Sequence, residues 1–381
     1  MIYLDHAATS LMKPPGVMEA VIRGMQQLGN AGRGAYESAL DASRLFYDTR
    51  LRLAELFAAD GPEQVAFTAN ATAALNIAIQ GILSPGDHVI TTQMEHNSVL
   101  RPLYFMESKG VRLTILPAGA DGRISYDEME AAIASDTRAI VCTHASNVTG
   151  EMNDLKRIGA VCAQHGLLLI ADVAQTAGTF PISMKEMNLD VICFSGHKSL
   201  LGPQGTGGIC VRKGLPVRPL LMGGSGVDSF AGKHPSRMPE ALEAGTQNGP
   251  GIAGLRATLD YIKETGMQSL REQELAYMWR FHDAVIKLPG IRIYGDFSDR
   301  AAMRAPIVSW NLKEHDAGRI ADELYQRYGL AVRAGVHCAP LMHRALKTAG
   351  QGAVRMSFSA MNTEAEIDLA IRAVLKLAEE G

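Results

Sequence analysis

The stretches LLLIADVAQ (167–175) and DVICFSGHKSLLGPQG (190–205) decide the fold of this 381-residue chain. Each begins with a continuous apolar run and then turns polar, which is typical of a strand that is buried on both faces and ends at a loop. Five further apolar runs lie at 64–69, 87–93, 112–118, 138–146 and 207–213. Helical patterns separate most of them, at 71–83, 98–109, 124–134 and 154–166. This alternation predicts an α/β protein with a mostly parallel sheet covered by helices.

The chain changes character after about residue 250. A helical region at 251–287 is followed by the runs IRIYG (291–295) and APIVSWNL (305–312), a helix near 316–328 and the run AVRMSFS (353–359). The last helix begins at Thr363 and Glu366, which match the T-x-x-E capping box. We therefore predict a large domain of residues 15–250 and a smaller α+β domain built from residues 1–14 and 251–381.

Composition and charge exclude several classes of protein. A net charge of −3 provides no basic surface for nucleic acid. No run approaches the roughly 18 apolar residues of a membrane span, and Asp5 and His6 stand where a signal peptide needs an apolar core. Four of the five cysteines lie in apolar runs, which fits a reducing compartment. We expect a cytoplasmic protein that binds neither nucleic acid nor membrane.

Reactive side chains follow the two deciding strands. Lys198 comes directly after the second strand; taken alone it is most often a solvated loop lysine, but a buried amine of lowered pKa can attack a carbonyl. Asp172 ends the first strand, where α/β proteins place ligand contacts. It is either a cap or loop acid, or the partner of a pyridinium nitrogen. Gln175, three residues on, could donate to a phenolate oxygen.

Three further strand ends carry matching groups. The turn FTANATAALN (67–76) runs from a strand into a helix and, with Thr72, offers an anion site of the kind that helix N-termini make. His96 is either a surface-loop histidine or a ring that stacks on a planar cofactor, and Asn147 follows another strand. An amine, a pyridinium acid, a phosphate turn and a stacking ring at one sheet edge together indicate pyridoxal 5′-phosphate (PLP).

With these motifs the chain resembles the class V aminotransferases of PLP fold-type I, and among them the group II cysteine desulfurases and selenocysteine lyases. The similarity runs from YLDHAATS to the final helix and rests on SGHK, ADVAQ, the pair Glu95–His96 and NVTG (147–150). It implies a seven-stranded sheet and PLP bound covalently to Lys198. The other contacts that the resemblance implies are Asp172 to the ring nitrogen, Gln175 to the ring oxygen, His96 to the ring face, Asn147 to the substrate or ring-oxygen side, and Thr72, Ser195 and His197 to the phosphate.

The resemblance also covers the segment LAVRAGVHCAP (330–340), which matches the desulfurase pattern R-x-G-x-H-C. Cys338 would then be the nucleophile that takes the substrate's sulfur as a persulfide and releases alanine. Arg355 would bind the substrate carboxylate through its planar fork, with Arg333 in a supporting role. His337, Cys338 and His343 also suggest a metal site, but no fourth ligand is apparent, so we expect no metal.

The segment EAGTQN (243–248) resembles a loop that reaches a neighbouring subunit's phosphate through its threonine, here Thr246, which implies a homodimer. The chain departs from the family at three places. Three residues instead of two separate Lys198 from Gly-Pro, Val336 replaces a histidine, and the phosphate turn reads NATA (70–73). These changes indicate a divergent branch that keeps the cofactor set.

The sequence therefore predicts a PLP-dependent cysteine desulfurase that converts L-cysteine to L-alanine and passes sulfur to an acceptor protein for iron–sulfur cluster or thiocofactor assembly. Three alternatives stay open: a selenocysteine lyase that acts on L-selenocysteine, a class V transaminase in which Cys338 is incidental, and a sulfur-relay scaffold without activity. The intact Lys198, Asp172 and His96 argue against the last.

Overall fold

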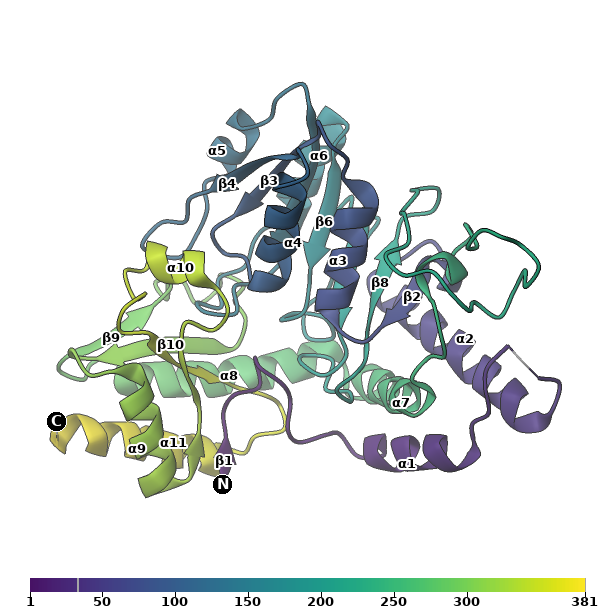
Figure 1. The fold of residues 1–381 in the computed structure, drawn as a ribbon. Helices are drawn as coiled ribbons and strands as arrows, with labels where there is room; N and C mark the ends of the chain where they lie inside the picture. Colours follow the sequence, from purple (N-terminus) through teal and green to yellow (C-terminus); the bar gives the residue numbers. More distant parts are fainter. Residues whose placement is uncertain (33, 381) are drawn as a thin grey trace.

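The structure is a computed structural model that describes residues 1–32 and 34–380. A seven-stranded sheet forms its centre, in the order β2-β8-β7-β6-β5-β3-β4 (Figure 1). Its strands are β2 (Val65–Thr68), β3 (His88–Thr92), β4 (Arg112–Leu116), β5 (Thr137–Thr143), β6 (Leu168–Asp172), β7 (Val191–Ser195) and β8 (Gly207–Val211). Neighbours from β7 to β4 pair in parallel, whereas β8 runs antiparallel to β2 and β7. The predicted mostly parallel α/β sheet is confirmed.

Helices cover both faces of this sheet. The connections between parallel strands hold α4 (Asn97–Glu107), α5 (Tyr126–Ala131) and α6 (Leu155–His165), and α3 (Ala71–Ile82) follows β2. The adjacent residues Val89 and Ile90 of β3 belong to different apolar clusters, because side chains alternate across a strand. One cluster includes α3 and α4, and the other includes α6 and α2 (Glu37–Phe57). Burial on both faces explains the continuous apolar runs of the sequence.

A second, antiparallel sheet follows in the order β12-β13-β10-β9 (Figure 1). Its strands are β9 (Ile291–Tyr294), β10 (Ile307–Leu312), β12 (Arg333–Gly335) and β13 (Ala353–Ser357). The remaining helices of this part are α8 (Met267–Val285), α9 (Ala317–Tyr328), α10 (Pro340–Ala345) and α11 (Glu364–Glu380). The N-terminal strand β1 (Ile2–Tyr3) pairs in parallel with β11 (Leu330–Ala331), so the two ends of the chain share one part of the molecule.

Two local features bear on the predicted elements. The helical region 251–287 is two helices, α7 (Gly249–Thr265) and α8, because Gly266 adopts a φ of 86° between them. α7 packs on α1 (Val17–Gln27) and α2, elements for which the sequence analysis made no prediction. Short 3₁₀ turns lie at Pro62–Gln64 and Glu240–Leu242. The division into domains at residue 250 stays a prediction.

The capping box of the last helix is present as predicted. The Thr363 backbone N–H donates to Glu366 Oε2 at 2.9 Å, and the Glu366 N–H donates to Thr363 Oγ1 at 3.3 Å. Two donors at the start of α11 are therefore satisfied by side chains. Among residues 1–32 and 34–380, no helix has the length and apolar character needed to cross a membrane.

A buried ion pair ties the two parts together. Glu151 follows β5 of the large sheet and Arg304 precedes β10 of the small one, and their side chains are 1% and 3% exposed. Arg304 Nη1 lies 3.1 Å from Glu151 Oε1, and its Nη2 donates to the Thr149 carbonyl at 2.6 Å. This pairing fixes the loop after β5, the loop that carries Asn147.

Candidate active site

A cavity of about 200 Å³ lies at the carboxyl edge of the seven-stranded sheet. Eight residues predicted for the site line it: Thr72, His96, Asn147, Asp172, Gln175, Ser195, His197 and Lys198. They come from five different connections of the sheet. Parallel strands bring their carboxyl ends to the same edge, so residues distant in sequence converge there. The topology alone accounts for this grouping.

The start of α3 forms one end of the cavity. Asn70 caps this helix by accepting from the Ala73 N–H at 2.9 Å, and the Ala71 N–H donates to Ser195 Oγ at 3.1 Å. Thr72 Oγ1 lies 2.7 Å from Ser98 Oγ. Backbone N–H groups and hydroxyls gathered at the N-terminus of a helix favour an anion. This end of the cavity is suited to a phosphate group.

Asp172 and Lys198 are the charged groups of the cavity. Asp172 is the last residue of β6, is buried, and accepts from the Ala174 N–H at 3.0 Å. Burial raises the pKa of its carboxyl above the usual value, while the Ala174 N–H and the charge of Lys198 oppose that rise. Burial lowers the pKa of the Lys198 amine, against the opposing charge of Asp172. A lowered pKa increases the share of neutral, nucleophilic amine.

Two histidines of the cavity are held neutral. His96 Nδ1 accepts from the Ser98 N–H at 3.0 Å, so this ring caps α4. Burial, followed by the charge of Lys198, lowers the pKa of His96 to about 4. Burial and Lys198 likewise lower the pKa of His197 to about 4, and its Nδ1 lies 3.0 Å from Thr9 Oγ1. Neutral rings at pH 7 can stack or share hydrogen bonds without adding positive charge to the cavity.

Two amides complete the lining. Asn147 Nδ2 donates to the His337 carbonyl at 2.8 Å, and its Oδ1 is buried without a hydrogen-bond partner among the described residues. Gln175 Nε2 donates to the Ala7 carbonyl at 3.0 Å. A buried unpartnered acceptor in the wall of a cavity is costly unless a ligand satisfies it.

Cys338 approaches the cavity from the second part of the molecule. It lies between β12 and α10, and its carbonyl accepts from the Asn97 N–H at 2.7 Å, directly beside His96. Its Sγ is 3.8 Å from Arg333 Nη2, and Cys338 lies close enough to Lys198 to influence the pKa of that amine. The other four cysteines are buried, whereas Cys338 is half-buried. The structure therefore brings together Cys338, Arg333 and Lys198.

Arg355 is fully buried in β13 and already has a carboxylate partner. Its Nη2 lies 2.6 Å from Asp5 Oδ1, its Nη1 donates to the Asn147 carbonyl at 2.9 Å, and its Nε has no partner among the described residues. The sequence analysis gave Asp5 no role in the site. The only signal was its position in the N-terminal motif YLDHAATS, 350 residues from Arg355.

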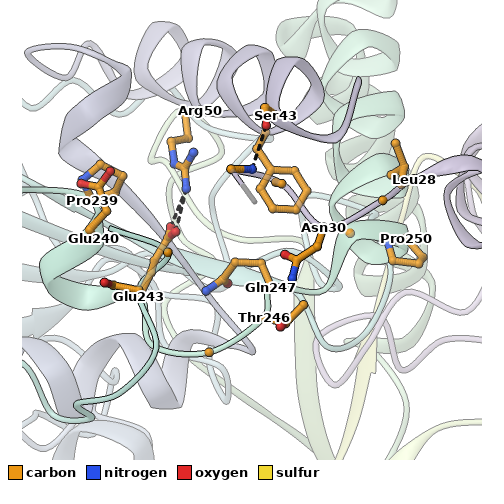
Figure 2. Close-up of a pocket in the computed structure, with 18 of the residues that line it drawn as sticks. Leu28, Asn30, Ser43, Arg50, Pro239, Glu240, Glu243, Thr246, Gln247 and Pro250 are labelled. Carbon is orange, nitrogen blue, oxygen red and sulfur yellow. Dashed lines mark hydrogen bonds and ion pairs between the residues drawn. The ribbon is translucent and has the colours of Figure 1, made fainter. Parts of the chain in front are cut away.

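Thr246 lies outside the Lys198 cavity. It is exposed and lines a separate cleft of about 490 Å³ together with the loop after α1. Figure 2 shows Thr246 in this cleft with the Arg50–Glu243 ion pair, whose closest atoms are 2.7 Å apart. A single copy of the chain thus does not bring Thr246 to its own Lys198. In the part of the chain that the structure describes, no group of three metal-ligating side chains is assembled.

A buried carboxyl lies on the other side of Lys198. Glu274 of α8 is 5% exposed and lines a small cavity of about 20 Å³ together with Lys198 and Gln175. Its Oε1 accepts from the Ala360 N–H at 3.2 Å. Burial raises the pKa of Glu274 to about 8, so this carboxyl is protonated near neutral pH.

The raised pKa makes the stability of the fold depend on pH. Between pH 4.5 and about 8 the folded protein retains a proton on Glu274 that the unfolded chain has released, so the free energy of unfolding falls as pH rises. Glu274→Gln removes this loss. We expect the free energy of unfolding of Glu274→Gln, relative to that of the wild type, to increase by up to about 1.4 kcal/mol for each pH unit across that interval.

Urea unfolding at several pH values measures this difference. The exposed Glu264→Gln variant is the matched control and should keep the pH dependence of the wild type. A constant difference between Glu274→Gln and wild type from about pH 5 to about pH 9 would contradict the assignment.

Comparison with known proteins shows the family of this chain. A family model described as Aminotransferase class-V matches residues 2–369. A probable cysteine desulfurase of Methanothermobacter thermautotrophicus is 32% identical over 387 residues, covering 100% of this chain and 95% of the relative. A cysteine desulfurase of Cronobacter sakazakii is 32% identical, covering 99% and 93%.

Solved structures agree with these relatives. The apo structure of a cysteine desulfurase from Thermococcus onnurineus NA1 superposes with a TM-score of 0.91 at 28% identity, covering 100% of this chain and 95% of the other. A cysteine desulfurase from Escherichia coli superposes with a TM-score of 0.88 at 29% identity, covering 100% and 94%. The similarity thus includes both sheets and the segment that carries Cys338.

Proposed function

Because the chain belongs to the class-V aminotransferase family, we propose that it is a PLP-dependent cysteine desulfurase. The reaction converts L-cysteine to L-alanine and leaves the sulfur as a persulfide on Cys338. One observation carries the proposal: a half-buried thiol beside Arg333 adjoins a cavity that holds an amine of lowered pKa. The full-length similarity to cysteine desulfurases supports the choice of substrate.

The cavity fits the family's cofactor. It offers an anion site at α3, a buried carboxyl and an amine, which match the phosphate, the ring nitrogen and the aldehyde of PLP. The unpartnered Asn147 Oδ1 is an acceptor and fits a donor such as the substrate's amino group. When bound, PLP supplies an electron-accepting ring that weakens bonds at the substrate carbons. We assign Lys198 to the covalent attachment, Asp172 to the ring nitrogen, His96 to the ring face, Gln175 to the ring oxygen, Asn147 to the substrate or ring-oxygen side, and Thr72, Ser195 and His197 to the phosphate.

The residues around the amine support proton transfer. Burial lowers the pKa of the Lys198 amine. The neutral form of this amine can accept a proton from the substrate and return it. Asp172 at the end of β6 would hold a proton on the ring nitrogen. The neutral His96 is anchored by Ser98, which fixes its ring against rotation.

In this proposal Cys338 is the nucleophile of the step that transfers sulfur. The thiolate of Cys338 forms an S–S bond with the substrate sulfur while the substrate's C–S bond breaks and its carbon takes up a proton. The products are alanine and a persulfide, with no external oxidant or reductant. Arg333 Nη2 lies 3.8 Å from Sγ and places a positive charge beside the sulfur.

The substrate is L-cysteine in this proposal, with L-selenocysteine as the alternative. The persulfide would pass to an acceptor protein for iron–sulfur cluster or thiocofactor assembly. We place the protein in the cytoplasm, where the reducing environment fits five free cysteines.

Cys338→Ala should bind L-cysteine but no longer release alanine steadily, because the sulfur has no acceptor thiol. We expect turnover to fall at least about 100-fold, which corresponds to about 2.7 kcal/mol of barrier. Alanine release measured side by side for wild type, Cys338→Ala and the exposed loop control Val336→Ala tests this. Unchanged turnover in Cys338→Ala would remove the thiol from the mechanism, and retained activity on L-selenocysteine alone would indicate the lyase.

Arg355 is the proposed site for the substrate carboxylate, in competition with Asp5. A second carboxylate at this guanidinium would lie next to the charge of Asp5, so like charges oppose substrate binding. Asp5→Asn should therefore lower KM for L-cysteine severalfold with kcat little changed, while Arg355→Lys should raise KM about 10-fold or more. Steady-state kinetics measures both. A higher KM in Asp5→Asn would contradict the competition.

A homodimer would bring Thr246 to a second active site. The residue lies away from its own Lys198, in a cleft beside α1. Met18, Ile22 and Met25 on one face of α1 are between 50% and 73% exposed, an apolar surface that a second copy would cover. Sedimentation velocity at micromolar concentration should give a dimer, and a monomer there would remove Thr246 from the cofactor site.

A further inference from the structure

A buried hydrogen-bond chain lies directly behind the Cys338 loop. His337 Nδ1 is 3.1 Å from His343 Nε2, and His343 Nδ1 is 2.7 Å from Thr348 Oγ1. The two rings are nearly parallel, with an interplanar angle of 24°. All three residues are at most 2% exposed. Neither His343 nor Thr348 lines the Lys198 cavity.

The backbone beside this hydrogen-bond chain is in an unfavourable conformation. His337 has a φ of 50° and Cys338 a φ of 56°, two consecutive residues with side chains in the left-handed region. This region is uncommon for residues other than glycine, and it persists only where the surroundings hold it. The conformation of the nucleophile's own backbone therefore depends on contacts outside the dipeptide.

Contacts outside the dipeptide hold this conformation, among them one from the His337 ring to the Arg333 carbonyl at 3.4 Å. The Asn147 side chain donates to the His337 carbonyl at 2.8 Å, and the Asn97 N–H donates to the Cys338 carbonyl at 2.7 Å. These two fix the carbonyl groups of the dipeptide. The imidazole chain holds the remaining element, the His337 side chain, and links it to His343 of α10 and to Thr348, three residues beyond that helix.

The order of donors in the chain depends on the Thr348 hydroxyl. Its Oγ1 lies 3.3 Å from the His343 carbonyl, to which it can donate. In one order it accepts from His343 Nδ1–H, and His343 Nε2 accepts from His337 Nδ1–H. In the opposite order His337 Nε2–H donates to the Arg333 carbonyl, 3.4 Å away, His343 Nε2–H donates to His337 Nδ1, and the Thr348 hydroxyl donates to His343 Nδ1. Both rings must be neutral for either arrangement. Burial, with the charge of Arg355, lowers the pKa of His337 to about 2 and that of His343 to about 4.

We propose that His343 and Thr348 are positioning residues for Cys338. Through His337 they hold the left-handed dipeptide and keep Sγ against Arg333 on the Lys198 side of the loop. They touch neither substrate nor cofactor in this role. The inference rests on the proposed function for its kinetic readout, but the accessibility of the thiol tests it without any substrate.

The pair Thr348→Val and Thr348→Ser isolates the hydroxyl. Valine keeps the branched shape and removes the hydrogen bond, while serine keeps the hydrogen bond and removes a methyl group. The exposed neighbour Arg344→Gln is the control for α10. In single turnovers with L-cysteine, we expect Thr348→Val to slow persulfide formation on Cys338 about 10-fold or more, with KM within about twofold of wild type. For Thr348→Ser and Arg344→Gln, the rate of persulfide formation and the KM should both stay within about twofold of wild type.

Alkylation of the holoenzyme by iodoacetamide gives the second readout. The other four cysteines are buried, so the rate reports on Cys338. We expect Thr348→Val to alkylate about threefold faster or more, since a released loop exposes the thiol, and Thr348→Ser to match wild type. If Thr348→Val does not fold, His343→Gln replaces it with the same expected changes.

Equal persulfide and alkylation rates in Thr348→Val and Thr348→Ser would overturn the proposal. A change in KM alone would also overturn the proposal, because the hydrogen-bond chain is assigned to positioning the thiol and not to substrate binding. If wild type forms no persulfide, the proposed function fails, while the difference in alkylation between the two variants still decides the positioning role.

Discussion

The parallel pairing of β3, β5, β6 and β7 is the constraint on which the site depends. It places the residues that follow these strands at one edge, so Asp172 and Lys198 face the same cavity as His96 and Asn147. Asp172 and His96 each bond to a residue two positions on in the sequence, but the sheet decides which side chains they face across the cavity. Burial lowers the pKa of His96 and the charge of Lys198 lowers it further, an effect that arises because the sheet brings the two side chains together.

The second part of the molecule completes the site from the opposite side. Arg355 in β13 bonds to Asp5 near the N-terminus and to the Asn147 carbonyl above the large sheet. Cys338 is held over the start of α4 by the Asn97 N–H. The thiol and the arginine therefore depend on contacts between the two parts, which the Glu151–Arg304 pair also stabilises. A substrate bound between them would meet cofactor chemistry on one side and a nucleophile on the other.

The sequence predicts those elements and side chains whose positions are determined by a local pattern of residues. Continuous apolar runs identified the strands, and the T-x-x-E box identified the start of α11. Polar residues after the strands, together with the family resemblance, indicated side chains that line the cavity. Contacts between segments that are distant in the sequence could not be predicted in this way. Asp5 and Arg355 lie 350 residues apart, and no periodicity links them. The buried Glu274 reads as a surface residue of a helix until α8 is seen packed beside Lys198.

The most direct test of the central claim is to find where the sulfur goes. Wild-type holoenzyme mixed with one equivalent of L-cysteine, without an acceptor, is digested and its cysteine peptides are weighed by mass spectrometry. The account predicts the added mass of one sulfur atom on the peptide that contains Cys338, in an amount equal to the alanine formed. Sulfur on another cysteine, or alanine formed with no sulfur on the protein, would contradict it.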